Sequence, residues 1–195
     1  MTAISPLQFI HKKGLFGDHH DKKESDLLEI SEVKNLTIVQ IVQYKKSLIQ
    51  LNSLDIDSLN LPLKELQVSS KNKTRILWSG PNTWLIISGD ENILKKIKEK
   101  FNDKDFSVTD ISHSRAVIQI KGQQSIEVLK KGCPINFNEF NINNCAGSIF
   151  HGINIVVDNI NSDPQTFNLL TLRSFGESLY HHITDASLEF GYLAV

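Results

Sequence analysis

The segment from Asp110 to Arg115 has the highest density of reactive side chains in the sequence. It reads Asp-Ile-Ser-His-Ser-Arg and places an acid, hydroxyls, an imidazole and a guanidinium directly before an apolar run. One interpretation is a clamp for a substrate or cofactor. The alternative is a structural network in which Asp110 and Arg115 satisfy backbone groups or each other. The pattern alone favours the structural network.

Three further groups of reactive side chains have plainer structural interpretations. Cys133 follows Gly132 and two lysines that could lower its thiol pKa, yet a structural thiol after a helix end is favoured over a nucleophile. The run 18–21, Asp-His-His-Asp, could hold a metal, but it lies in a polar stretch and a solvated loop is favoured. His181 and His182 flank an apolar stripe and are expected at its rim.

Two common kinds of site have no signature here. A phosphate-binding loop needs clustered glycines before a helix, whereas Gly80, Gly89 and Gly122 are isolated. A structural zinc site needs four closely spaced ligands, and Cys133 and Cys145 belong to no C-x-x-C pair. We therefore expect no catalytic residue, no metal site and no cofactor held by this chain alone.

Composition narrows the class of protein. The 195 residues include 21 basic and 22 acidic side chains, so no electrostatic footprint for nucleic acid or an anionic membrane is expected. The N-terminus has no signal-peptide pattern, and no stretch approaches the roughly 20 apolar residues that a bilayer requires. Only two cysteines are present, which is typical of a reducing compartment. These features predict a soluble cytoplasmic protein.

Runs of β-branched and aromatic residues predict the strands that position these side chains. Trp78 and Trp84 flank a hairpin turn over 79–82, where they are expected as core or interface anchors. The predicted strands cover residues 37–42, 75–78, 83–87, 116–120 and 166–172, and residues 148–157 form either one bent strand or a hairpin about His151-Gly152.

Three helices are predicted from caps and apolar stripes. Asp90 caps the first, which runs through Phe101, and the second spans 125–131 with Gly132 at its C-terminal end. The third begins with a capping box of Ser174 and Glu177. Its apolar stripe comprises Phe175, Leu179, Ile183, Ala186 and Phe190, and Gly191 ends it.

Strands mixed with a few helices, without strict β-α-β alternation, predict an α+β fold with helices packed on a mostly antiparallel sheet. Residues 1–30 are expected to form an extended N-terminal arm with an apolar tip, which docks either on its own domain or on a partner. Residues 31–195 are expected to form one domain, with a possible division into sub-domains over about 31–105 and 106–195.

Five segments in order resemble one family, the gamma subunit of heterotetrameric sarcosine oxidase, and the resemblance spans most of the chain. The region from about Gln43 to Lys73 matches only loosely. The segments that carry the resemblance are Ser5-Pro6-Leu7, residues 77–85 (LWSGPNTWL), residues 110–117 (DISHSRAV), residues 128–135 (VLKKGCPI) and residues 173–179 (RSFGESL).

The resemblance implies both a fold and an assembly. The fold is that of the folate-binding aminomethyltransferases, an α+β protein built of ferredoxin-like halves. The assembly contains alpha, beta and delta subunits as partners, and the whole enzyme converts sarcosine to glycine with hydrogen peroxide and methylene-tetrahydrofolate as further products. FAD, FMN, NAD, tetrahydrofolate and zinc are expected in those partners. This chain is expected to be an accessory subunit of the oxidoreductase with no active site of its own.

The resemblance also leaves a folate-binding alternative. Related folate-binding proteins carry a similar acid-Ser-His stretch, so Asp110, His113 and Arg115 are the candidate residues if folate binds here. Their Lys-Gly-Cys motif continues with an aromatic residue, Gly and Gln, whereas Lys131-Gly132-Cys133 continues with Pro134 in this sequence. The alternative function is a stand-alone folate-dependent one-carbon transferase that uses Asp110 as its acid.

Overall fold

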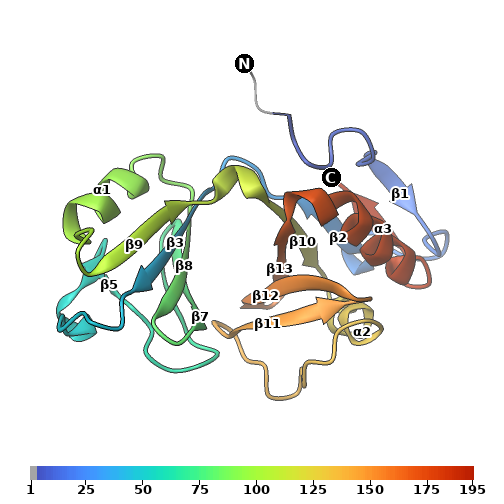
Figure 1. The fold of residues 1–195 in the computed structure, drawn as a ribbon. Coiled ribbons are helices and arrows are strands. Elements are labelled where there is room, and N and C mark those ends of the chain that lie inside the picture. Colours follow the sequence, from blue (N-terminus) through green and yellow to red (C-terminus); the bar gives the residue numbers. More distant parts are fainter. Residues whose placement is uncertain (1–3) are drawn as a thin grey trace. The chain divides into compact units, whose positions relative to one another are not determined.

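A computed structural model describes residues 4–195, so the first three residues of the expected arm lie outside the described part. The chain forms two compact units, each assembled from separate segments (Figure 1). Unit 1 comprises Met1–Lys34, Ser114–Ile142 and Gly147–Val195, and unit 2 comprises Asn35–His113 and Asn143–Ala146. Each unit thus combines segments that are distant in sequence.

Unit 1 is built on a sheet whose seven strands follow the order β1-β14-β2-β10-β13-β12-β11. Neighbouring strands run antiparallel in the pairs β1–β14, β2–β10, β10–β13 and β12–β13, whereas β2 and β14 run parallel. The strands are β1 (Gly14–Phe16), β2 (Leu28–Glu32), β10 (Arg115–Lys121), β11 (Cys145–Phe150), β12 (Ile153–Ser162), β13 (Gln165–Leu172) and β14 (Tyr192–Ala194).

The segment 148–157, expected as a bent strand or a hairpin, is a hairpin. His151 and Gly152 separate β11 from β12 and both have positive φ, 46° and 81°. Two consecutive positive φ values are typical of a type I′ turn, which suits the twist of paired strands. The turn thereby places the His151 ring at the end of the hairpin.

Two helices pack in unit 1, α2 (Ser125–Lys130) and α3 (Gly176–Ser187). In α3 the expected stripe is correct for Leu179, Ile183 and Ala186, which are buried, but Phe175 is 48% exposed and precedes the helix. The 3-10 turns of this unit are η1 (Glu24–Asp26) and η4 (Arg173–Phe175).

The predicted capping box of Ser174 and Glu177 is wrong. The N-cap of α3 is Phe175, and no side chain caps the helix. The η4 turn occupies the place of the expected first turn, so α3 starts at Gly176. A Cβ at Gly176 would lie 3.0 Å from the Cβ of Ala116, so the start of the helix packs closely on β10.

Unit 2 contains a five-stranded sheet in the order β6-β7-β8-β3-β9, with antiparallel pairing throughout, and a small two-stranded sheet of β4 and β5. Its short 3-10 turns are η2 (Leu51–Ser53) and η3 (Ser112–Ser114), the latter ending at the boundary with unit 1. The strands are β3 (Thr37–Gln43), β4 (Asp55–Ile56), β5 (Leu59–Asn60), β6 (Val68–Lys71), β7 (Thr74–Gly80), β8 (Thr83–Ser88) and β9 (Phe106–Asp110).

One face of this sheet carries the core of unit 2, on which α1 (Ile93–Lys100) packs through Ile93 and Ile97 (Figure 1). Trp84 is 1% exposed, and its indole N–H donates to the carbonyl of Pro62 at 2.7 Å. Trp78 lies opposite Trp84 across the β7–β8 hairpin and is half-buried. Trp84 is therefore a core anchor with a satisfied polar atom.

The start of α1 differs from the prediction by a few residues. Asp90 precedes the helix, and its Oδ1 accepts from the backbone N–H of Asn92 at 2.9 Å, while the helix itself begins at Ile93. The predicted strands and the α+β class with mostly antiparallel sheets are confirmed. The sequence did not predict seven further strands, β1, β2, β4, β5, β6, β9 and β14.

The N-terminal segment packs within unit 1. Leu7 is fully buried, and Gly14, Leu15 and Phe16 form strand β1 against β14. Of the two arrangements considered for the arm, packing on its own domain is the one that these residues adopt. Among residues 4–195, no helix is both long and apolar enough to span a bilayer.

Candidate functional site

Asp110 is the last residue of β9, and the turn that follows it is closed by its carboxylate. Its Oδ1 accepts from the backbone N–H of Ser112 at 2.9 Å and from the Ser112 hydroxyl at 2.5 Å. Ser112 Oγ in turn accepts from the backbone N–H of Ile38 at 2.9 Å. The carboxylate therefore organises the end of β9 and its attachment to β3.

These hydrogen bonds also set the protonation state of Asp110. The bond from the Ser112 hydroxyl is the main cause that lowers the pKa of Asp110 below 3.8, followed by the bond from the Ser112 amide, while burial opposes the shift. Nearby positive charge on His113 and Lys98 acts in the same direction as the hydrogen bonds. An Asp with a lowered pKa is an anion at neutral pH, which suits binding to a cation or donor and not proton donation.

The other two candidate residues have separate surroundings. His113 is exposed at the end of a segment of unit 2, whereas Arg115 opens β10 in unit 1. The Arg115 guanidinium donates to the carbonyl and the hydroxyl of Ser114, at 3.3 and 3.2 Å. Burial lowers the pKa of Arg115 from its ordinary value. The local contacts of Asp110 and Arg115 are those of the structural network considered above.

Cys133 is 5% exposed, and its thiol donates to the hydroxyl of Ser148 at 3.3 Å. Gly132, just before it, follows Lys131, the C-cap of α2, so its expected place at the C-terminal end of this helix is confirmed, although its φ is not positive. A Cβ at Gly132 would lie 2.7 Å from the ring of His151. A side chain at this position would therefore displace the His151 ring, and Cys133 is a small buried side chain.

The histidines of unit 1 lie at its surface. The rings of His151 and His182 are 5.1 Å apart between centroids, and His181 and His182 are both exposed on α3. The predicted position of His181 and His182 at the rim of the apolar stripe is confirmed.

His19 and His20 stack on each other at 4.4 Å, and Asp18 pairs with Lys22 at 3.0 Å. Within the described residues, no group of three or more His, Cys, Asp or Glu side chains could hold a metal ion.

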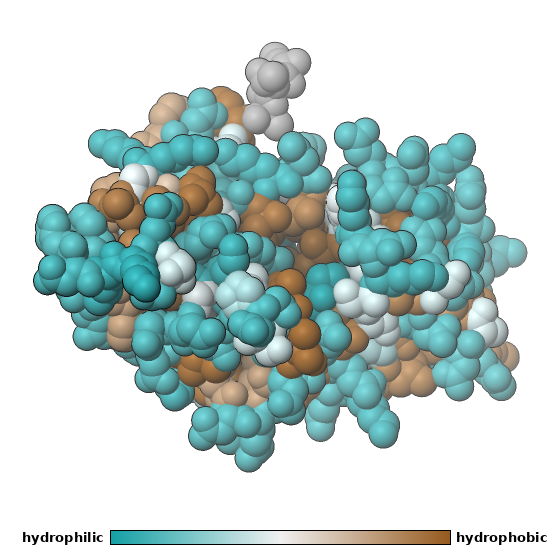
Figure 2. Space-filling model, turned by 180° about the vertical axis from the view of Figure 1, so that it is seen from behind, coloured by the Kyte–Doolittle hydropathy of each residue, from teal (hydrophilic) through white to brown (hydrophobic). Residues whose placement is uncertain are grey.

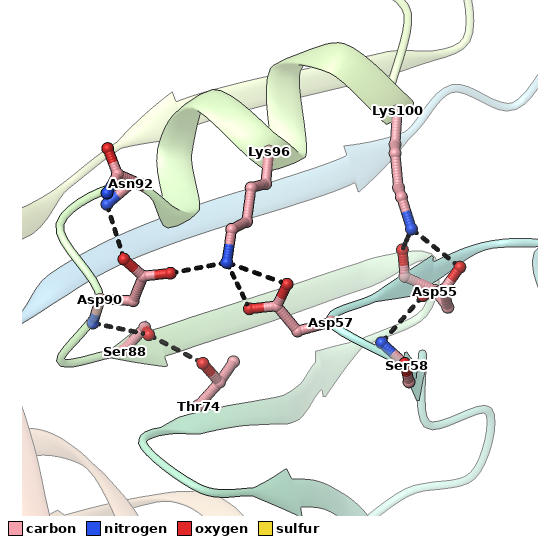
Figure 3. Close-up of polar contacts among 9 residues, drawn as sticks. All are labelled: Asp55, Asp57, Ser58, Thr74, Ser88, Asp90, Asn92, Lys96 and Lys100. Carbon is pink, nitrogen blue, oxygen red and sulfur yellow. Dashed lines mark hydrogen bonds and ion pairs between the residues drawn. The ribbon is translucent and has the colours of Figure 1, made fainter.

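Sequence reasoning missed an ionic network on the surface of unit 2 (Figure 3). The Lys96 ammonium lies 3.0 Å from Asp57 Oδ2 and 2.8 Å from Asp90 Oδ2. One turn later Lys100 lies 2.9 Å from Asp55 Oδ1 and also donates to the Asp55 carbonyl at 3.1 Å. The two lysines share one face of α1, so the network fastens this helix to the β4–β5 hairpin.

The network shifts the pKa values of its members. The hydrogen bond from Lys96 lowers the pKa of Asp90, and that from Lys100 lowers the pKa of Asp55. The hydrogen bond to Asp90 raises the pKa of Lys96, with Asp57 the second cause. Each of the three carboxylates thus has a lysine partner, with Lys96 shared by two of them, which suits attachment of the helix more than catalysis. The available signal was a pair of lysines four apart on a predicted helix, although residues 43–73 offered no pattern to pair with them.

Two open hollows lie elsewhere on the units. One in unit 1 has a volume of about 350 Å³ beside the ion pair of Lys121 and Glu29, whose atoms are 2.9 Å apart. One in unit 2, of about 440 Å³, lies along η2 and the β4–β5 turn and includes Asp55. Neither includes Asp110, His113, Arg115 or Cys133.

Comparison with known proteins gives a consistent set of relatives. The family model described as sarcosine oxidase, gamma subunit family, matches residues 51–189. The sarcosine oxidase subunit gamma of Corynebacterium sp. (strain U-96) is 29% identical over 121 residues, which are 60% of this chain and 58% of that protein. The chain thus matches a little more than half the length of this curated relative.

Solved structures share the fold. The heterotetrameric sarcosine oxidase from Corynebacterium sp. U-96, in complex with pyrrole 2-carboxylate, contains a chain that matches with a TM-score of 0.81 at 21% identity, covering 96% of this chain and 95% of that one. The aminomethyltransferase T of the glycine cleavage system from Bartonella henselae matches with a TM-score of 0.58 at 10% identity, covering 82% of this chain and 46% of that one. The expected aminomethyltransferase-like fold is confirmed.

Proposed function

The chain belongs to the sarcosine oxidase gamma subunit family, and on that premise we propose that it is an accessory, non-catalytic subunit of a heterotetrameric sarcosine oxidase. The match of the family model over residues 51–189 is the observation that carries this proposal. The whole enzyme would oxidatively demethylate sarcosine to glycine, reduce oxygen to hydrogen peroxide and form methylene-tetrahydrofolate from the released one-carbon unit.

In this proposal the chemistry belongs to the partner subunits. The alpha, beta and delta subunits hold FAD, FMN, NAD, tetrahydrofolate and zinc, and this chain contributes shape and contact surface. The state of its most reactive segment supports the assignment, because the carboxylate of Asp110 is used by hydrogen bonds from Ser112. The proposed location is the cytoplasm, which agrees with the presence of only two cysteines in the sequence.

The alternative is a stand-alone folate-dependent one-carbon transferase. Its support is the fold shared with an aminomethyltransferase. An acid that gives up a proton near neutral pH needs a raised pKa, whereas the pKa of Asp110 is lowered by its hydrogen bonds with Ser112. The space beside Gly132 is also filled, because the ring of His151 lies within 2.7 Å of where a Cβ would be. These contacts favour the accessory role.

The two functions are separated by studying the purified chain and the complex side by side. The chain alone should show no flavin absorbance, no stoichiometric zinc and no oxidation of sarcosine. Calorimetric titration with tetrahydrofolate should give no heat of binding, for the native chain and for Asp110→Asn alike. Binding by the native chain that is lost in Asp110→Asn would support the transferase instead.

A further inference from the structure

Large apolar side chains are exposed at one place on unit 1 where the chain is firmly held. Phe9 is 75% exposed and Ile4 is 55% exposed, both on the N-terminal segment. Phe175 and Leu172, beside η4, are 48% and 44% exposed. We call these four residues, Ile4, Phe9, Leu172 and Phe175, the Phe9 patch. Exposed apolar side chains that gather in one region mark interaction sites more often than scattered ones do.

The N-terminal segment is anchored on both sides of Phe9. Leu7 is completely buried, and Ser5 donates a hydrogen bond to the carboxylate of Glu32. His11 contacts the hydroxyl of Tyr180 through Nδ1 at 2.9 Å and the carbonyl of Val195 through Nε2 at 2.7 Å. The exposure of Phe9 is therefore a property of an ordered segment, which presents the ring without a large loss of chain entropy on binding.

The same segment runs beside η4, which unites the patch. Arg173 donates a hydrogen bond to the carbonyl of Ile4. A Cβ on Gly176 would lie 3.4 Å from Pro6 and 3.6 Å from Leu7. Figure 2 shows that hydrophobic side chains reach the surface at several places on the visible face, among hydrophilic ones. Two stretches distant in sequence thus contribute to one surface region.

The N-terminal side of the patch carries positive charge. Residues 4–17 include no Asp or Glu, whereas Lys12 and Lys13 are exposed. Neither lysine forms a salt bridge with another of the residues 4–195. A symmetric contact between two copies of this chain would bring these like charges toward each other. The charge pattern therefore favours a different chain with an acidic surface.

We propose that the Phe9 patch docks into an apolar pocket with an acidic rim on a larger subunit of the oxidase. The inference rests on the proposed function and deepens it by naming the contact surface and the chemistry of its partner. Phe9 and Phe175 serve as the anchors, since buried aromatic residues carry most of the free energy of such contacts. Lys12 and Lys13 accelerate association by steering, as rim charges do.

The test is co-expression of the tagged chain with the alpha and beta subunits of the oxidase. Recovery of the complex is compared for the native chain, Phe9→Ser with Phe175→Ser, and the control Leu48→Ser. Leu48 is an ideal control because it is 94% exposed on unit 2, far outside the patch in sequence. Assembly is compared only among variants whose melting temperature equals that of the native chain. Substitution of exposed residues should barely change this temperature.

The expected result is at least a tenfold weaker assembly for the double variant, unchanged assembly for Leu48→Ser, and slower association for Lys12→Glu with Lys13→Glu. Native-level assembly by the double variant would overturn the docking surface and leave the proposed function intact. Failure of the native chain itself to assemble would overturn both. A double variant that loses self-association and keeps assembly would show that the patch binds a second copy instead.

Discussion

The helices of the two units are held by different forces. In unit 1, α3 has 12 residues, seven of them buried, and no side chain caps its start. In unit 2, α1 has eight residues, two of them buried, and two of its lysines reach three aspartates. Burial removes apolar area from water, whereas exposed ion pairs gain little against solvent. Changes of surface charge should therefore leave the packing of α3 intact, whereas the stability of α1 should depend on salt and pH.

The largest effect is expected for truncation of the buried face of α3. Leu179 is 0% exposed, so Leu179→Ala should lower the free energy of unfolding by about 2 to 5 kcal/mol through the lost burial and the cavity left behind. The control is Leu188→Ala, because Leu188 is 44% exposed and lies just after the helix. Urea unfolding of both variants checks the prediction. Equal losses for the two would mean that α3 does not face the sheet as described.

A smaller effect is expected in the core of unit 2. Trp84→Phe removes the indole N–H that the buried carbonyl of Pro62 accepts, so the free energy of unfolding should fall by about 1 to 3 kcal/mol. Trp78→Phe, at the opposite and half-buried position of the hairpin, should cost less. The comparison by thermal and urea unfolding fails if Trp78→Phe is the costlier change.

The ion pairs of α1 should contribute less than either core. Lys96→Met should lower the free energy of unfolding by less than either core change, because solvent screens these exposed pairs, and the loss should shrink in high salt. Lys95→Met is the control, since Lys95 lies exposed on the same helix without a salt bridge among the described residues.

The stability of Lys96→Met should also depend less on pH than that of the native chain. The folded pKa of Asp90 lies below 3.8, so its contribution is present above pH 3.8 and is lost as the pH falls through the folded pKa. The free energy of unfolding, measured from pH 7 to pH 2, should therefore fall less steeply at the acid end for Lys96→Met than for the native chain. An unchanged dependence on pH would show that Lys96 does not lower the pKa of Asp90.

The smallest effect is expected at Ser174. Its side chain caps no helix in the structure, so Ser174→Ala should change the free energy of unfolding by no more than about 0.5 kcal/mol. A loss of about 1 kcal/mol, the ordinary value for a broken cap, would restore the capping box that the sequence suggested.

These cases show which features a sequence can predict. The strands and the buried stripe through Leu179 and Ile183 follow from periodicity, because burial of one face dictates it. The start of α3 depended on the approach of Gly176 to Ala116, two residues 60 positions apart, which no local pattern records. Of the two partners of Lys96, Asp90 was singled out only as a helix cap, and Asp57 lies 39 positions before the lysine, where no local pattern connects the two. The expected division into an arm and one domain with two sub-domains remains a prediction.

For the candidate segment, the sequence indicated which residues could react but not what their side chains contact. The sequence singled out Asp110, and the structure gives the reason in the hydrogen bonds with Ser112. It did not reveal that Arg115 opens a strand of the other unit. Whether Asp110, His113 and Arg115 contact folate stays a prediction, for which the tetrahydrofolate titration is the test.

The most direct test of the account is the composition of the purified oxidase. The alpha, beta and delta subunits are co-expressed with and without this chain, and the products are weighed by native mass spectrometry while sarcosine-dependent hydrogen peroxide is measured. The account predicts one copy of this chain in each complex, with flavin retained by the partners, and poor recovery of the complex when the chain is omitted. A complete, fully active complex that excludes this chain would contradict it.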